Sequence, residues 1–193
     1  KLIDKDKTYS LIEALELAIK TSVVKFDATV ELHVNLGVDP KIADQNVRDS
    51  VTLPAGTGKT LRIAVFCEDN EATKVKATGA DIAGEAEFLA QLDKEEINFD
   101  VLITSPQLMA RLGKYAKLLG PKGLMPNPKS GTITTDTVKA IKEARAGRVE
   151  YRVDAAGIIH LGIGKVSFGT EKLSQNADAV LSSIRAAKPA SLK

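Results

Sequence analysis

The segment Thr29-Val30-Glu31-Leu32-His33-Val34-Asn35-Leu36 decides how the two ends of this chain fold. Its apolar and polar residues alternate strictly, which is the pattern of a β-strand with one buried face and one face in water. The same alternation returns at residues 148–154, and a turn at Ala155-Ala156-Gly157 leads from there into a third strand, predicted over residues 158–168. The sequence therefore predicts an antiparallel sheet with strands from both ends of the chain.

Helices at both ends can cover this sheet. Ser10 and Glu13 have the spacing of a capping box at the start of one helix, and Thr170 can cap a final helix with apolar residues at helical spacing. Residues 1–55 and residues 148–193 each contain too few elements to close a core alone. We therefore expect the two ends to form one α+β domain together.

The middle of the chain, residues 56–147, has a different pattern. Residues 61–66 and residues 99–104 are short, mostly apolar runs among helical patterns, which is typical of a parallel sheet covered on both faces. The helices are expected at residues 71–78, 85–95, 106–119 and 135–146. The prediction is thus an α/β chain of two domains, with a contiguous α/β domain inserted into the α+β domain. Gly56 and Gly147 mark the two crossings and are expected to act as a hinge.

Composition excludes several classes of protein. A chain of 193 residues with 44% hydrophobic and 27% charged residues suits a globular protein of one or two domains, and not a disordered or fibrous one. No apolar run approaches the roughly 20 residues of a membrane span, and no apolar signal segment stands at the start. The single cysteine, Cys67, cannot form an internal disulfide, which favours a reducing compartment, by default the cytoplasm.

The charge is nearly balanced in total but uneven along the chain. The total of 27 basic and 25 acidic residues argues against an indiscriminate nucleic-acid coat. Residues 1–55 carry 7 basic and 9 acidic residues, residues 56–147 carry 13 and 12, and residues 148–193 carry 7 and 4. No acidic residue lies between Asp100 and Asp136, where five Lys and Arg residues do. Any nucleic-acid binding must come from such local charge.

Two glycine-rich segments resemble nucleotide-binding motifs without completing them. Gly56-Thr57-Gly58-Lys59-Thr60 ends like a phosphate-binding loop, but Leu53 stands where the first glycine is required, and a strand is expected after it. Gly162-Ile163-Gly164 begins like a dinucleotide fingerprint, but Ser167 replaces the third glycine. A glycine-rich connector is the better interpretation of the first segment. A nucleotide-binding α/β enzyme using the Gly56–Lys59 loop stays open as the alternative function, and a hinged two-domain receptor for a small ligand as a weaker one.

The sequence indicates no catalytic residue, no metal ion and no cofactor. His33 and His160 are the only histidines, and Cys67 is far from both, so no metal-ligand spacing occurs. His33 falls on the polar face of its strand and is interpreted as a solvated surface residue. Because Asp and Glu are scattered without a paired-carboxylate pattern, an enzyme is not expected.

The segment Leu119–Gly131, with the sequence LGPKGLMPNPKSG, contains three Pro, three Gly and two Lys. Such a composition specifies a loop of fixed path with positive charge. It is either a rigid surface loop between two helices or a loop whose lysines and exposed amides bind RNA phosphates. The residues alone favour neither interpretation.

This loop closely resembles the signature of the ribosomal protein L-one family, large-subunit proteins of the mobile stalk beside the tRNA exit site. The bacterial type fits best. Further matching segments follow in order along nearly the whole chain: Lys25-Phe26-Asp27, Asn35-Leu36-Gly37-Val38-Asp39, Asp44-Gln45-Asn46-Val47-Arg48, Gly157-Ile158-Ile159-His160 and Ile163-Gly164-Lys165. The resemblance implies a domain built from both termini, an inserted Rossmann-like domain with a mostly parallel sheet, and a hinge between them.

The resemblance also implies a function without catalysis or a cofactor. The implied partners are large-subunit ribosomal RNA, deacylated tRNA in the exit site, whose movement and release the stalk assists, and the protein's own messenger RNA, whose translation it represses. It further implies a protein that is monomeric within the ribosome, cytoplasmic, and without a membrane partner.

The RNA contact that the resemblance implies combines the first strand and the loop before it with a strand near the other end of the chain. Carried over by position, its residues are Lys25, Phe26, Thr29, Glu31, His160, Gly164, Lys165 and Ser167. Their chemistry partly agrees, because Lys25 can neutralise a phosphate and Phe26 can pack on a ribose or base. Glu31 can accept a hydrogen bond from a 2′-OH or orient a neighbouring cation. A second contact with RNA or tRNA is predicted at Lys122 and Lys129.

The sequence departs from the family pattern in two places. Ala28 stands where many relatives have Glu, which removes one polar partner. The family usually continues into a final strand with a Thr-Met-Gly segment that contacts RNA, whereas this sequence ends at Lys193. The first domain is therefore expected to lack its last strand.

Overall fold

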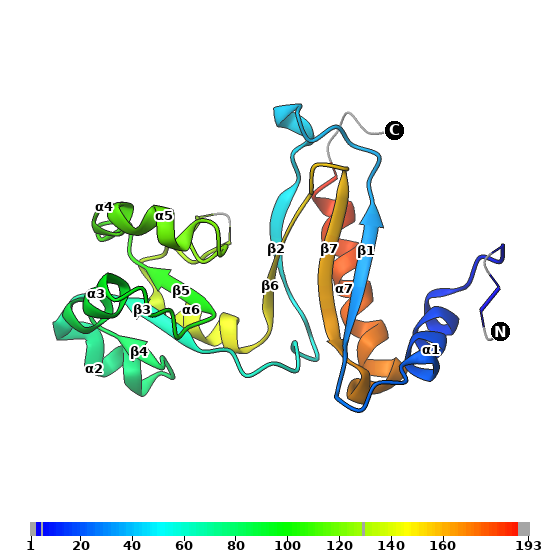
Figure 1. Ribbon diagram of the computed structural model, residues 1–193, viewed down its shortest axis with the longest axis horizontal. Coiled ribbons are helices and arrows are strands. Elements are labelled where there is room, and N and C mark those ends of the chain that lie inside the picture. Colours follow the sequence, from blue (N-terminus) through cyan, green and yellow to red (C-terminus); the bar gives the residue numbers. More distant parts are fainter. Residues whose placement is uncertain (1–2, 5, 129, 189–193) are drawn as a thin grey trace. The chain divides into compact units, whose positions relative to one another are not determined.

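The computed structural model describes residues 3–4, 6–128 and 130–188 (Figure 1). The chain divides into two compact units, one of residues 1–59 and 146–193 and the other of residues 60–145. We call the first the terminal unit and the second the inserted unit. Each unit has its own hydrophobic core.

The terminal unit is built on two small antiparallel sheets. Its elements are α1 (Leu11–Thr21), β1 (Thr29–Asn35), β2 (Arg48–Thr52), β6 (Arg148–Arg152), β7 (Ile158–Lys165) and α7 (Gly169–Ala186), with 3-10 turns at Ala43–Gln45 and Val166–Phe168. β1 pairs with β7, and β2 pairs with β6. This confirms the antiparallel pairing of strands from both chain ends, whereas β2 was not predicted.

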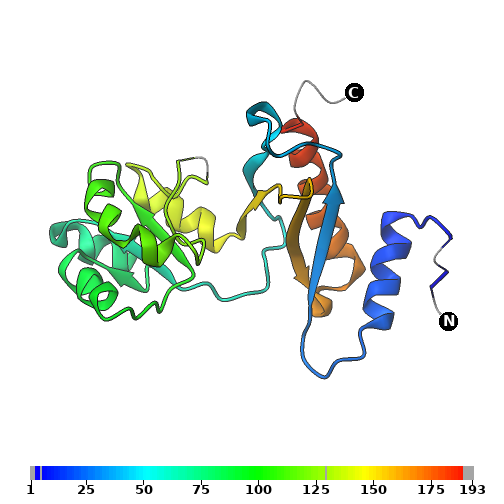
Figure 2. The ribbon, with the colours of Figure 1, turned by 45° about the horizontal axis from the view of Figure 1, so that its top comes forward.

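The core of the terminal unit lies between α7 and the strands. Buried side chains of α7, including Leu173 and Val180, cluster with Ile159 of β7 and Tyr151 of β6, and α7 runs along the β1–β7 pair in both views (Figures 1 and 2). The alternation that predicted β1 is visible in its burial, since Val30 is buried and Glu31 is exposed. The pattern works because one face of the pair meets this core and the other meets water.

Of the two helix caps predicted in the terminal unit, the structure has one. Ser10 caps α1 as predicted: its N–H donates to Glu13 Oε2 at 2.9 Å, and Glu13 N–H donates to Ser10 Oγ at 3.4 Å. The prediction that Thr170 caps α7 is wrong, because α7 begins at Gly169 and has no side-chain cap. The strand predicted over residues 158–168 ends at Lys165.

The inserted unit is a parallel sheet with helices on both faces. Its elements are β3 (Ile63–Phe66), α2 (Asp69–Ala77), β4 (Ile82–Ala83), α3 (Ala86–Asp93), β5 (Val101–Thr104), α4 (Met109–Leu112), a 3-10 turn (Gly113–Tyr115), α5 (Ala116–Leu119) and α6 (Thr137–Arg145). The strand order is β4-β3-β5. Ile63 and Val65 pack with α2 and α6, whereas Ala64 and Phe66 pack with α3, α4 and α5. The inserted parallel α/β sheet is therefore confirmed.

The inserted unit departs from one local prediction and agrees with another. The single helix predicted over residues 106–119 is wrong, because a 3-10 turn beginning at Gly113 separates α4 from α5; glycine lowers helix propensity by about 1 kcal/mol relative to alanine. The segment Gly56–Thr60 leads into strand β3 and not into a helix, as its sequence predicted. It therefore lacks the helix N-terminus on which a phosphate-binding loop depends.

Candidate nucleic-acid interface

The loop between α1 and β1 is fixed to the end of β7 by Asp27. Its carboxylate accepts the N–H of Ser167 at 3.0 Å and the hydroxyl of Ser167 at 2.7 Å, while Val166 N–H donates to Ala28 O at 2.9 Å. The bond from the Ser167 hydroxyl, followed by the bond from its N–H, holds the pKa of Asp27 below its usual range. These contacts give the loop a defined path.

Two side chains that the sequence singled out stand exposed on this loop. Phe26 is 71% exposed, and Lys25 is exposed without an ion-pair partner among the described residues. A large apolar side chain on a fixed loop retains its unfavourable contact with water unless a partner covers it. An aromatic face beside a free ammonium group suits a base or ribose with its phosphate.

Lys165 brings a second positive charge to the same surface. Its ammonium donates to Thr29 Oγ1 at 3.0 Å and to Asp27 O at 3.2 Å. No carboxylate among the described residues lies within ion-pair distance of this ammonium. Lys165 is therefore oriented by neutral oxygens, and its charge also helps to lower the pKa of the Asp27 carboxyl.

A row of four polar side chains continues along the outer face of the β1–β7 pair. The register places His33 opposite His160, and their Nδ1 atoms are 2.6 Å apart. His160 Nε2 lies 3.1 Å from Asp154 Oδ2, and His33 Nε2 lies 3.7 Å from Glu31 Oε2. Hydrogen bonds, above all from the N–H of Ile158, hold the pKa of Asp154 below its usual range.

The histidine pair was not predicted. The side chain of His33 is 54% exposed, which agrees with its interpretation as a surface residue, but that interpretation gave it no partner. Because two imidazoles at this distance share a hydrogen, one nitrogen must donate and the other accept. The sequence could have suggested the pair, because both histidines occupy polar-face positions of their strands. It did not give the register of the two strands, which decides that His33 and His160 lie opposite each other.

Gly164 lies behind this surface and not on it. The residue is buried with φ 150°, and a Cβ atom here would lie 2.8 Å from Phe168 Cδ2 and 2.9 Å from Leu173 Cδ2. It is opposite Val30, where the register shifts between Val30 and Glu31. The position thus supports a close packing of β7 on the core at an irregular point of the ladder.

The segment Leu119–Gly131 belongs to the inserted unit, and hydrogen bonds tie its described residues to one another and to Thr132. Ser130 Oγ donates to Asn127 O at 2.9 Å, and Asn127 N–H donates to Thr132 Oγ1 at 2.8 Å. Lys122 is exposed on this loop. Lys129, the other predicted contact, lies outside the described residues.

No described group of side chains indicates a metal site. Among the residues that the structure describes, no three His, Cys, Asp or Glu side chains are arranged to hold a metal ion. Cys67 is buried, and this burial raises the pKa of its thiol, which makes the thiolate scarce. Within the described ranges, no helix has the length and apolar character needed to cross a membrane.

The comparison with protein families identifies the chain. The model of the ribosomal protein L1p/L10e family matches residues 18–193, which includes the inserted unit, the terminal unit from residue 18 onward and all the residues of the surface described above. Members of this family are non-enzymatic structural proteins of the ribosome, and membership implies binding to ribosomal RNA in the large subunit. The chain therefore belongs to the ribosomal protein L1p/L10e family.

Proposed function

We propose that this protein binds a folded segment of large-subunit ribosomal RNA through the outer face of the β1–β7 pair and the loop before β1. We call this face, formed by Lys25, Phe26, Thr29, Glu31, His33, His160 and Lys165, the β1–β7 surface. The observation that carries the proposal is Phe26, 71% exposed on a loop that Asp27 and Ser167 fix in place.

Each side chain of this surface has a distinct role in the proposal. Lys25 and Lys165 neutralise phosphates, and Phe26 stacks on a base or packs on a ribose. Glu31 and the histidine pair offer acceptors and donors to 2′-hydroxyl groups. Ser167 and Gly164 act on the RNA indirectly: the hydroxyl of Ser167 is donated to Asp27, and Gly164 is buried.

The proposal extends to the role of the protein in translation. As part of a mobile stalk of the large subunit, it would assist the movement and release of deacylated tRNA from the exit site. It would also repress its own translation by binding a similar structure in its messenger RNA. The family membership supports both roles, and a messenger segment with the same shape would compete with ribosomal RNA for the β1–β7 surface.

Binding of an rRNA fragment from the stalk to single variants tests the proposal. Phe26→Ala should cost about 1–3 kcal/mol of binding free energy. Lys25→Ala should weaken binding and reduce the slope of log affinity against log salt by about one, because one phosphate contact is lost. Lys188→Ala, at an exposed position after α7, is the matched control. The proposal is wrong if both variants bind the fragment as the unaltered protein does.

Competition tests the repressor role separately. A segment of the protein's own messenger RNA should displace the rRNA fragment from the unaltered protein, and Phe26→Ala should weaken both complexes to a similar degree. The repressor proposal would be contradicted if both RNAs bound at the same time, or if Phe26→Ala left the affinity for the messenger RNA unchanged. Either result would show that the messenger RNA binds outside the β1–β7 surface.

A further inference from the structure

The outer face of the β2–β6 pair carries a row of arginines. The antiparallel register places Arg48 directly opposite Arg152, Ser50 opposite Glu150, and Thr52 opposite Arg148. Like charges directly opposite one another destabilise a strand pair. A surface that keeps two arginines in this arrangement gains stability when an anion lies between them.

The hydrogen bonds on this face leave one guanidinium without a partner. Arg48 uses Nε in an ion pair with Glu150, and Arg148 donates to Ser50 Oγ from NH2 at 2.9 Å. Arg152 makes no hydrogen bond or ion pair with any described residue. The unpaired charge therefore lies directly opposite a second guanidinium.

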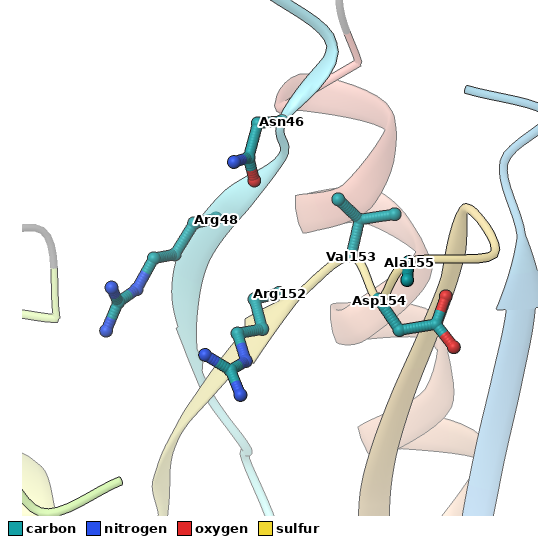
Figure 3. Close-up of a pocket in the computed structure, with 6 residues that line it drawn as sticks. All are labelled: Asn46, Arg48, Arg152, Val153, Asp154 and Ala155. Carbon is teal, nitrogen blue, oxygen red and sulfur yellow. The ribbon is translucent and has the colours of Figure 1, made fainter. Parts of the chain in front are cut away.

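Two acids lie two residues from Arg152 in the sequence, Glu150 and Asp154, and both have other partners: Glu150 pairs with Arg48. Asp154 Oδ1 accepts the N–H groups of Ala156 and Ile158 at 2.9 and 2.8 Å, and Asp154 Oδ2 lies 3.1 Å from His160 Nε2. Figure 3 shows the Asp154 carboxylate turned away from the side on which the two guanidinium groups project. It is therefore not placed to neutralise Arg152.

The two arginines border a hollow. A hollow of about 390 Å³ is lined by Asn46, Arg48, Arg152, Val153, Asp154 and Ala155 (Figure 3). The side-chain amide of Asn46 adds neutral hydrogen-bond donors to the two guanidinium groups. Val153 and Ala155 provide an apolar wall, which strengthens the attraction between the arginines and an anion by reducing nearby water.

The geometry points to a second RNA contact, in which Arg48, Arg152 and Asn46 bind a phosphate of the RNA backbone. The planar fork of a guanidinium matches the oxygens of a phosphate in bidentate fashion. Arg148 lies four residues before Arg152 on β6, about 13 Å away at roughly 3.3 Å per residue, and Glu150, which lies between them, is paired with Arg48. This inference rests on the RNA binding proposed above and adds a site outside the β1–β7 surface.

Binding of the same rRNA fragment to Arg152→Ala tests this second contact. The variant should bind about tenfold or more weakly, because a charge-assisted hydrogen bond is lost, and its salt slope should fall by about one. Arg185→Ala, an exposed arginine in the last turn of α7, should bind as the unaltered protein does. Arg152→Lys retains the charge but not the planar fork of the guanidinium, and its affinity for the fragment should lie between those of the unaltered protein and Arg152→Ala.

Stability measurements distinguish a lost RNA contact from a misfolded variant. Because Arg152 is exposed and faces a like charge, Arg152→Ala should unfold in urea at the same midpoint or a higher one. Normal RNA affinity of a folded Arg152→Ala variant overturns the second contact. If Phe26→Ala still weakens binding in that case, the proposed function survives, and if neither variant weakens binding, both proposals fail.

Inorganic phosphate distinguishes an RNA site from a site for a free anion. The Nε–Hε signals of Arg48 and Arg152, followed by NMR in the whole chain, should respond to the rRNA fragment at far lower concentrations than to phosphate alone. The fragment should also displace the phosphate. Tight phosphate binding that the fragment does not displace would assign the hollow to a free anion and overturn the RNA contact.

Discussion

At the scale of single residues, Asn176 ties together three parts of the terminal unit. This asparagine of α7 is 0% exposed, and its Oδ1 accepts the N–H of Ala55 at 2.9 Å. Its Nδ2 donates to Gly56 O at 3.0 Å and to Ile163 O at 2.7 Å. A single buried amide thus holds the first crossing against β7.

Removing this amide should destabilise the protein strongly. Asn176→Leu leaves a buried N–H and two carbonyl groups without partners, and we expect a loss of about 2–4 kcal/mol in the free energy of unfolding. Urea denaturation followed by circular dichroism measures it. Ser182→Ala, an exposed change on the same helix, should be near neutral, and equal stability of the two variants would contradict the role of Asn176.

The lowered pKa of Asp27 predicts that the loop between α1 and β1 loses stability in acid. An aspartate whose pKa is lower in the folded state adds stability that is complete above its unfolded pKa, about 3.9. This stability is lost as the pH falls through the lowered folded pKa. Bonds from Ser167 lower the pKa of Asp27. Between roughly pH 4 and pH 2, the free energy of unfolding should therefore fall less in Asp27→Asn than in the unaltered protein.

Urea denaturation at several pH values checks this prediction. Asp178→Asn, an exposed change on α7, is the control and should follow the unaltered protein. Parallel pH curves for Asp27→Asn and the unaltered protein would show that the bonds to Ser167 do not depend on the charge of Asp27.

The residues of the β1–β7 surface show how far the sequence leads. The resemblance pointed to Lys25 and Phe26, and the polar pattern put Glu31 on the outer face. Asp27 and Ser167 are 140 positions apart in the chain, and no local pattern connects them. The pairing of His33 with His160 depends on strand register, which the core packing of both strands sets and which alternation alone leaves open.

At the scale of elements, the irregular end of β7 shows why a glycine stands at position 164. Gly164 is packed against Phe168 and Leu173 with no space for a Cβ atom. The following turn, Val166–Phe168, places Ser167 against Asp27. The packing at Gly164 therefore helps to position the loop that carries Phe26.

Substituting this glycine should destabilise the protein. Gly164→Ala forces Phe168 or Leu173 to move and places a side chain at φ 150°, and we expect a loss of about 1–3 kcal/mol in the free energy of unfolding. Gly113→Ala is the matched control, since a Cβ atom there meets nothing within 4 Å. Its stability should be unchanged or slightly higher. A Gly164→Ala variant as stable as Gly113→Ala would contradict this account of the strand.

Element prediction succeeded where hydrophobic periodicity was strong and failed where it was weak. Alternation found β1 and β6, the turn at residues 155–157 led to β7, and apolar runs found β3 and β5. The strand β2 (Arg48–Thr52) was missed because its only apolar residue is Val51, and pairing with β6 fixes it instead. The two-residue strand β4 (Ile82–Ala83) is too short to show a period.

At the scale of the whole molecule, the two crossings between the units are anchored on both sides. In the terminal unit, Leu53 N–H donates to Gly147 O at 3.1 Å, and a Cβ atom on Gly147 would lie 2.6 Å from Gly56 Cα. In the inserted unit, Arg145 Nε donates to Gly79 O at 3.0 Å, and Arg62 N–H donates to Asp100 Oδ2 at 2.9 Å.

These anchors refine the hinge proposed at Gly56 and Gly147. We propose that the two units move relative to each other, with the backbone change absorbed at residues 59–61 and at Ala146, since both glycines are held within the terminal unit. Small-angle X-ray scattering of the chain without RNA should require an ensemble of arrangements. A single rigid shape that fits the data both with and without RNA would contradict the hinge.

Crosslinking to ribosomal RNA tests the central claim most directly. Ultraviolet crosslinking of the protein to the rRNA fragment, with the attached peptides identified by mass spectrometry, should give crosslinks concentrated at Lys25, Phe26 and the strands of the β1–β7 surface. Phe26→Ala should reduce those crosslinks. Crosslinks confined to the inserted unit, with the β1–β7 surface unmodified, would contradict the account.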